Sequence, residues 1–173
     1  MFPGWQGLTV MTRQKTGQED RRLQAWTDFV LSYNRLMGVL EGEMQRQAGI
    51  TLSQYDVLLR LAETAEGRMK MSELADAIVY STGGLTRLFE RMRRAGLVRR
   101  EPSAVDRRVI YAVLTEPGTE RLRAASAVHL DGVGKHFSAY LADDEVDTVA
   151  TFLGRLHDNN LRCPAQMPDQ CES

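Results

Sequence analysis

Arginines gather in one part of this 173-residue chain. Eight of them lie between Ser81 and Ile110 against three acidic residues, which gives this stretch a formal charge of +5 in a chain whose net charge is −1. The remaining residues therefore sum to −6. A guanidinium group offers a planar fork of donors that matches phosphate oxygens and base edges. A basic block on an acidic body is typical of a nucleic-acid-binding face, and we favour that interpretation over a plain solvated surface.

Four of these arginines fall on one predicted helix, between positions 82 and 94. Its apolar residues have the i, i+3, i+4, i+7 spacing of one buried face: Leu85, Leu88, Phe89 and Met92. The opposite face carries a mostly basic and polar set: Gly83, Thr86, Arg87, Glu90, Arg91 and Arg94. A helix divided in this way is suited to lie in a groove of DNA. Glu90 is unusual there, and it either pairs with Arg94 one turn later or accepts from a cytosine amine.

Another helix and a turn precede this arginine-bearing helix. We expect the first helix over residues 71–78, with Ser72 as its N-cap, and the turn at residues 79–81. Ser81 is a suitable N-cap for the second helix, and Gly96 ends it. The pattern predicts a helix-turn-helix.

A hairpin is expected to follow. Residues 97–100 and 109–114 are rich enough in β-branched and apolar side chains to form two paired strands. The loop between them is too long for a tight turn and ends in Arg107 and Arg108. Such a loop is typical of a wing that reaches toward the minor groove, where a narrow groove concentrates negative potential.

At these residues the sequence resembles the MarR (multiple-antibiotic-resistance regulator) family of bacterial winged-helix transcription factors. The resemblance runs through LSQYDVLLRLAE, MSELADAI and LTRLFERMRRAGLVRREPSAVDRRVIYAVLTEPG, and covers Trp26 to Leu161. It implies a mainly α fold with a small β-hairpin wing, in which a winged helix-turn-helix is flanked by N- and C-terminal dimerisation helices. It also implies a homodimer on double-stranded DNA, a repressor in most relatives, with two helices in successive major grooves of a palindromic operator.

Carried over position by position, the resemblance implies contacts from the second helix to DNA. We expect Thr86, Arg87 and Arg91 to touch bases or phosphates. The backbone amides at Thr82 and Gly83 lie at the start of the helix, where they are expected to attract phosphate.

The wing is expected to add contacts of its own. Asp106 should hold an arginine in place, while Arg108 or Arg107 enters the minor groove. The full set of expected DNA-binding residues is Ser81, Thr82, Gly83, Thr86, Arg87, Arg91, Arg94, Asp106, Arg107 and Arg108.

The helix-turn-helix and the wing form the expected DNA-binding lobe, and the rest of the chain is organised around this lobe. The expected divisions are a flexible leader (1–19), a first dimerisation helix (20–48), the DNA-binding lobe (51–115), further dimerisation helices (116–162) and a disordered tail (163–173), with 20–162 forming one domain. The first helix bears a long aromatic-rich stripe that a small domain would not cover alone: Leu23, Trp26, Phe29, Val30, Tyr33, Leu36, Met37, Leu40 and Met44.

Local signals place the remaining helix ends. Thr51 and Gln54 have the spacing of a capping box, and Thr115 can cap the helix that follows the wing. That helix is expected to reach Tyr140, with a bend or break at Gly132 and Gly134. The last helix is expected to start near residues 143–145.

Many relatives release DNA when a small aromatic acid or phenol binds between the dimer helices and the DNA-binding lobe. Trp26, Tyr33 and Tyr55 are the residues here that could line such an effector pocket. Ordinary core packing is the alternative for all three, and we favour it.

Two further kinds of trigger stay open at the sequence level. Cys163 and Cys171 could form a reversible disulfide, although inert tail thiols are favoured. His129, Asp131 and His136 are the only candidate metal cluster, and their spacing suits no single ion without outside ligands. A redox- or metal-responsive regulator and a winged-helix protein-interaction module are therefore the alternative functions.

Other classes of protein are not expected. No phosphate-binding glycine loop, zinc motif or nucleophile elbow occurs, so we expect neither an enzyme nor a bound cofactor. No stretch is apolar enough to span a membrane, and the start of the chain does not resemble a secretory signal. We therefore expect a cytoplasmic protein.

Overall fold

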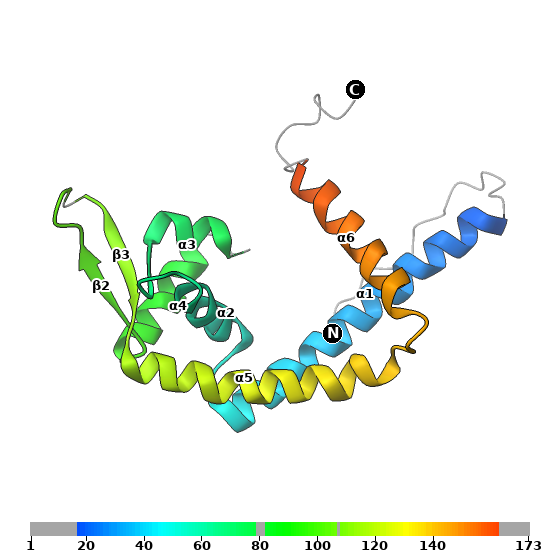
Figure 1. Ribbon diagram of the computed structural model, residues 1–173, viewed down its shortest axis with the longest axis horizontal. Helices are drawn as coiled ribbons and strands as arrows, with labels where there is room; N and C mark the ends of the chain where they lie inside the picture. Colours follow the sequence, from blue (N-terminus) through cyan, green and yellow to red (C-terminus); the bar gives the residue numbers. More distant parts are fainter. Residues whose placement is uncertain (1–16, 79–81, 107, 163–173) are drawn as a thin grey trace, which may run out of the picture.

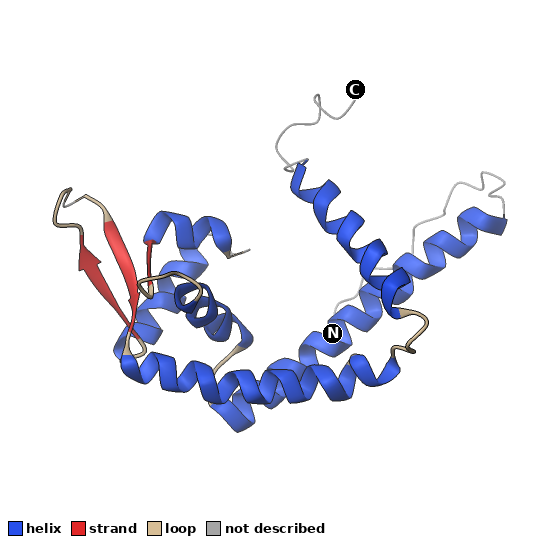
Figure 2. Ribbon diagram, in the orientation of Figure 1, coloured by secondary structure: helices blue, strands red, loops and turns tan. Residues whose placement is uncertain are grey.

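A computed structural model describes residues 17–78, 82–106 and 108–162 (Figure 1). The elements in chain order are α1 (Gly17–Glu43), a π-helical turn (Met44–Ala48), α2 (Leu52–Ala62), β1 (Arg68–Lys70), α3 (Met71–Ala77), α4 (Thr82–Arg94), β2 (Val98–Pro102), β3 (Ile110–Leu114), α5 (Glu116–His136), a 3-10 turn (Ser138–Tyr140) and α6 (Val146–Arg162). The expected mainly α fold with a winged helix-turn-helix is confirmed. Helices α2–α4 and the sheet form one lobe, α5 runs beneath it, and α1 and α6 cross at the other end (Figures 1 and 2).

Helix α1 presents an aromatic row that the other described parts of the chain leave largely exposed. The rings of Trp26, Phe29 and Tyr33 follow one another with centroids 6.2 and 6.3 Å apart. Their side chains are 59%, 41% and 53% exposed. Toward the C-terminal end of α1 the same stripe becomes buried at Leu40, and it continues at Met44 in the π-helical turn. The stripe therefore serves the core at one end of α1 and stays open at the other.

Helix α2 begins with the expected capping box. The Thr51 hydroxyl accepts from the Gln54 amide at 3.1 Å, and the Gln54 side chain accepts from the Thr51 amide at 2.9 Å. Each bond satisfies a backbone donor that a helix start leaves unpaired.

Replacing Thr51 with alanine is expected to lower the free energy of unfolding by about 1 kcal/mol, because it removes the acceptor for the Gln54 amide. Urea unfolding followed by circular dichroism measures the change. Thr51→Ser keeps the hydroxyl, so its free energy of unfolding should fall much less. Equal losses in the two variants would contradict the capping role.

The expected N-cap of α3 is wrong. The helix begins at Met71 after Lys70, and Ser72 lies inside its first turn with an exposed side chain. The Glu73 carboxylate accepts from the Lys70 backbone amide at 3.2 Å and from its Nζ at 2.8 Å. A glutamate at the third helical position reaches back to the residue before the helix, and this bond fixes the start two residues earlier than a cap at Ser72 would.

The wing belongs to a sheet of three antiparallel strands in the order β1-β3-β2. Strands β2 and β3 form the expected hairpin, with Val98 opposite Leu114 and Pro102 opposite Ile110. Strand β1 was not expected from the sequence. It is three residues long and pairs with the far side of β3, with Met69 opposite Ala112.

Helix α5 runs unbroken through both of its glycines, so the expected bend or break is wrong. Gly132 is buried against α1, where an added Cβ would lie 2.7 Å from Leu40 Cδ2. The absence of a side chain at Gly132 lets α1 approach α5 closely, and it does not interrupt α5. The helix ends at His136 instead of Tyr140, and Phe137, the residue that follows it, is 41% exposed.

The hydrophobic core lies where α2, α3, α4, the sheet and α5 meet. Its largest fully buried side chains are Phe89, Met44, Leu58, Leu61, Leu74, Met92, Val57 and Val98. Across residues 17–78, 82–106 and 108–162, no helix is long and apolar enough to cross a membrane.

Candidate nucleic-acid interface

Helix α4 is divided as the sequence predicts. The four apolar residues of its inner face, Leu85, Leu88, Phe89 and Met92, are all buried. The helix ends in a left-handed glycine, Gly96 with φ of 73°, and the Leu97 amide bonds back to the Met92 carbonyl at 3.0 Å. Burial of one face and a fixed exit hold the helix rigidly, and its opposite face stays open to a ligand.

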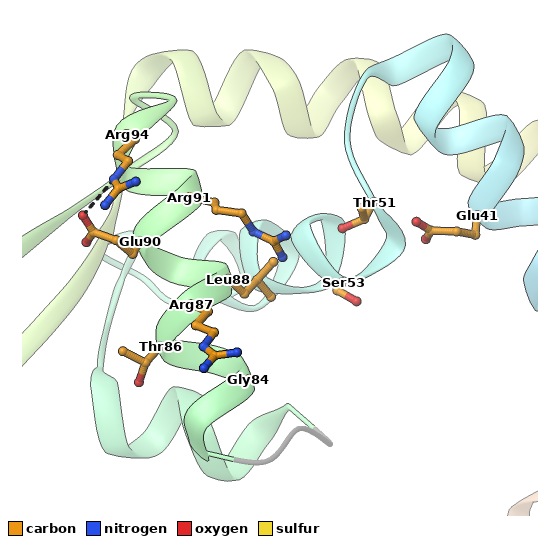
Figure 3. A pocket seen from close by; sticks show the side chains of 10 residues that line it. All are labelled: Glu41, Thr51, Ser53, Gly84, Thr86, Arg87, Leu88, Glu90, Arg91 and Arg94. Carbon is orange, nitrogen blue, oxygen red and sulfur yellow. Dashed lines mark hydrogen bonds and ion pairs between the residues drawn. The ribbon is translucent and has the colours of Figure 1, made fainter.

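A cavity of about 830 Å³ lies along this open face (Figure 3). It is lined by α4 on one side and by the end of α1 and the start of α2 on the other: Glu41, Thr51, Ser53, Gly84, Thr86, Arg87, Leu88, Glu90, Arg91 and Arg94. The structure therefore brings together the four expected α4 contacts with described side chains, Thr86, Arg87, Arg91 and Arg94.

Arg87 and Arg91 differ from most other arginines of the lobe. Both are exposed, and neither guanidinium has a hydrogen bond or ion pair with any residue that the structure describes. By contrast, Arg68 pairs with Glu66 at 2.5 Å and lies over the Tyr111 ring at 4.9 Å. The donors of Arg87 and Arg91 are therefore free to bind phosphates or base edges.

Glu90 is neutralised within its own helix. Arg93 donates from Nε and Nη2 to the carboxylate at 3.0 and 2.8 Å, and Arg94 donates from Nε at 3.3 Å. The hydrogen bonds from Arg93, helped by the charge of both arginines, lower the pKa of Glu90 from 4.5 to about 2. Of the two expected roles for Glu90, the ion pair is the one present in the structure.

An NMR titration of the Glu90 carboxyl carbon is therefore expected to show a midpoint near pH 2 instead of 4.5. Because the pKa is lowered in the folded protein, the ion pairs stabilise the fold above pH 4.5, and this contribution is lost as the pH falls toward 2. Arg93→Ala should move the midpoint upward. A wild-type midpoint near 4.5 would show that the pairs do not persist in solution.

Serine and aspartate hydrogen bonds build the tip of the wing. Ser103 Oγ accepts from the amides of Val105 and Asp106 at 3.2 and 3.3 Å. Asp106 Oδ1 accepts from the Arg108 amide at 3.0 Å. Asp106 therefore accepts a hydrogen bond from the Arg108 main chain, and the Arg108 side chain is exposed. Arg107 lies outside the described residues.

The start of α4 is described only in part. Ser81 lies outside the described residues, as does the turn at 79–81 that was expected to join the two helices. Thr82 and Gly83 belong to the first turn of α4, but their exposure is not described. Their expected amide contacts to phosphate stay a prediction.

The three residues expected around an effector do not meet in the cavity that Tyr33 lines. Tyr33 lines a second cavity of about 570 Å³ between α1, the end of α5 and α6: Phe29, Ser32, Tyr33, Leu36, His136, Phe137, Tyr140, Leu141, Val149 and Leu153. Trp26 and Tyr55 are absent from that lining. Tyr55 instead packs against the core, with its ring 5.0 Å from that of His129.

Only part of the chain that carries the candidate residues for the alternative triggers is described by the structure. That part contains no group of three or more metal-ligating side chains. His136 bonds through Nε2 to Glu43 at 2.9 Å and so links α5 to α1. Cys163 and Cys171 both lie outside the described residues.

Comparison with known proteins gives a consistent result. The sequence profile of the MarR family matches residues 48–109. The chain is 35% identical to AbsC, a MarR family transcriptional regulator from Streptomyces coelicolor, covering 87% of this chain and 99% of that one with a TM-score of 0.76. It is 26% identical to Sco3205, a MarR family regulator from the same organism solved in complex with DNA, covering 91% and 96% of the two chains with a TM-score of 0.77. It is also 26% identical over 136 residues to the HTH-type transcriptional repressor MdtR of Bacillus subtilis, covering 77% of this chain and 86% of that protein.

Proposed function

The chain belongs to the MarR family of transcriptional regulators, and from that premise we propose that it binds double-stranded DNA sequence-specifically as a homodimer. The observation that carries the proposal is the open face of α4. Arg87 and Arg91 have free guanidinium donors there, and the buried inner face fixes the helix that bears them. Helix α4 would enter the major groove, and the wing with Arg108 would reach the minor groove.

The exposed apolar residues support a dimer. On α1 and α6 the described part of the chain leaves a series of them exposed: Leu23, Trp26, Phe29, Tyr33, Val146, Phe152, Leu153 and Leu156. Monomeric proteins rarely expose contiguous apolar patches of this kind. A second copy that covers them would place two α4 helices on a two-fold symmetric site, and sedimentation analysis should then give twice the chain mass.

Repression and release by an effector complete the proposal. The similarity to a repressor of Bacillus subtilis supports repression as the sign of regulation. The cavity beside Tyr33, with its aromatic lining, supports a small aromatic effector at the junction of α1, α5 and α6. Such coupling usually changes DNA affinity by about 1–3 kcal/mol.

The test is binding of the purified protein to duplexes selected from random sequences, followed by fluorescence anisotropy at several salt concentrations. We expect a two-fold symmetric sequence that outcompetes random duplex, with an affinity that falls steeply with salt. Equal, weak binding to all duplexes would overturn the proposal. Addition of aromatic acids and phenols to the same assay tests the effector.

A further inference from the structure

Glu41 places a negative charge on the wall of the cavity that holds Arg87 and Arg91. It belongs to the last turn of α1, on the side of the cavity opposite α4. In Figure 3 the Arg91 side chain reaches from α4 toward Thr51 and Ser53, and Glu41 lies beyond Thr51. An acidic group therefore faces the groove into which the arginines would draw a DNA backbone.

Two hydrogen bonds hold the Glu41 carboxylate in place. Oε2 accepts from the amide of Leu52, the first residue of α2, at 2.8 Å. Oε1 accepts from the side-chain amide of Gln45. The Leu52 amide is one of the donors that a helix start leaves unpaired, so the carboxylate has a structural reason to stay there. Because both donors are neutral, they fix the charge without cancelling it.

The other acid in the cavity behaves differently. Glu90 is paired with Arg93 and Arg94, which offset its charge. Glu41 has no cationic partner among the described residues, just as Arg87 has no acidic one. Among the described residues, the cavity thus has Arg87 and Arg91 without an acidic partner on one wall, and a hydrogen-bonded carboxylate without a cationic partner on the other.

We propose that Glu41 is a specificity-determining residue of the DNA interface, an inference that rests on the proposed function. A phosphate drawn to Arg87 or Arg91 from the side of α2 meets the fixed carboxylate and is repelled. Random duplex is held by phosphate attraction alone, so it is sensitive to this repulsion. A duplex with α4 in its major groove presents base edges to the arginines and is less sensitive. Glu41 therefore penalises non-specific binding more than specific binding.

The test compares Glu41→Gln with wild type on the selected operator and on random duplex at about 0.1 M salt. Glutamine has the same shape and still offers an oxygen to the Leu52 amide, but it carries no charge. We expect affinity for random duplex to rise about 3–10-fold. Affinity for the operator should change less than about twofold, so the specificity ratio falls. The salt dependence on random duplex should steepen by about one phosphate contact.

Control variants separate charge from helix capping. Glu120→Gln removes an exposed carboxylate of α5 and should leave the specificity ratio at its wild-type value. Glu41→Asp keeps the charge but draws it back by one methylene group, so the ratio should fall by less than in Glu41→Gln. A fall of similar size in either control, or an unchanged ratio in Glu41→Gln, would overturn the inference.

A second variant covers the case in which Glu41→Gln does not fold. Gln45 is exposed, and Gln45→Ala frees the carboxylate from one of its two restraints. It should lower the ratio about twofold, because a mobile charge can move away from an approaching phosphate. An unchanged ratio in this variant would then overturn the inference. Absence of any sequence preference in the wild-type protein would instead overturn the proposed function.

Discussion

Replacing Arg91 with alanine is expected to weaken binding to the selected operator by about 1–3 kcal/mol, because a guanidinium that reads a base edge contributes that much discrimination. Arg91 is exposed on α4 and lines the same cavity as Arg87. Its side chain has no hydrogen bond or ion pair with a described residue. No existing interaction has to break before it reaches DNA. Fluorescence anisotropy on operator and random duplex measures the loss.

Arg93→Ala is the matched control, because it removes the same charge from the same helix. The Arg93 guanidinium already donates two hydrogen bonds to Glu90, so it is less available to DNA. We expect Arg93→Ala to lower DNA affinity less than Arg91→Ala does, and by the same factor for both duplexes. If Arg91 touches only phosphate, Arg91→Ala should lower the affinity for operator and random duplex equally. An unchanged affinity for both duplexes would show that Arg91 is not part of the interface.

The parts of the interface that were predictable from sequence are those set by neighbours along the chain. The division of α4 into a buried and a basic face follows from helical periodicity, so Phe89 and Arg91 could be assigned to opposite sides without a structure. The capping box at Thr51 and the ion pair between Glu90 and Arg94 are also local, within three or four residues.

Features that depend on distant partners were missed or misjudged. Strand β1 exists only because β3, more than forty residues later, offers it an edge. The helix continues through Gly132 because α1 fills the space above it, which no pattern within α5 reveals. In the sequence Glu41 resembles any other exposed charge on a helix, and only its hydrogen bond to Leu52 shows that it lies at the cavity beside α4.

The aromatic residues show the same limit for the effector pocket. Periodicity places Trp26 and Tyr33 on one face of α1, and the structure agrees. Periodicity cannot show which aromatic residue of α2 would join them, because that depends on how the two helices cross. Tyr55 turns toward α5 instead and packs against His129.

Replacing Gly118 with alanine is expected to lower the free energy of unfolding by about 2–3 kcal/mol, because the new methyl group has no room. Its Cβ would lie 2.1 Å from the backbone oxygen of Leu97 and 2.8 Å from Leu114 Cδ1. A backbone oxygen cannot rotate away as the end of a side chain can. The first turn of α5 would have to move off the start of the wing.

Gly134→Ala is the matched control in the same helix. An added Cβ there meets nothing within 4 Å, so alanine should stabilise the helix by about 0.5–1 kcal/mol. Urea unfolding of both variants measures the difference, and a Gly118→Ala protein as stable as Gly134→Ala would contradict the close contact.

The same contact gives a physical reason for the sequence of residues 114–118, LTEPG, which joins the wing to α5. Thr115 caps α5 by accepting from the Gly118 amide at 3.1 Å, and its hydroxyl donates to the Gly96 carbonyl. The end of α4 and the start of α5 are therefore joined through Thr115, and the missing side chain of Gly118 lets Leu97 lie against the turn. We expect Gly118→Ala to disturb the placement of α4 as well as the fold, so operator affinity should fall even at temperatures where the variant remains folded.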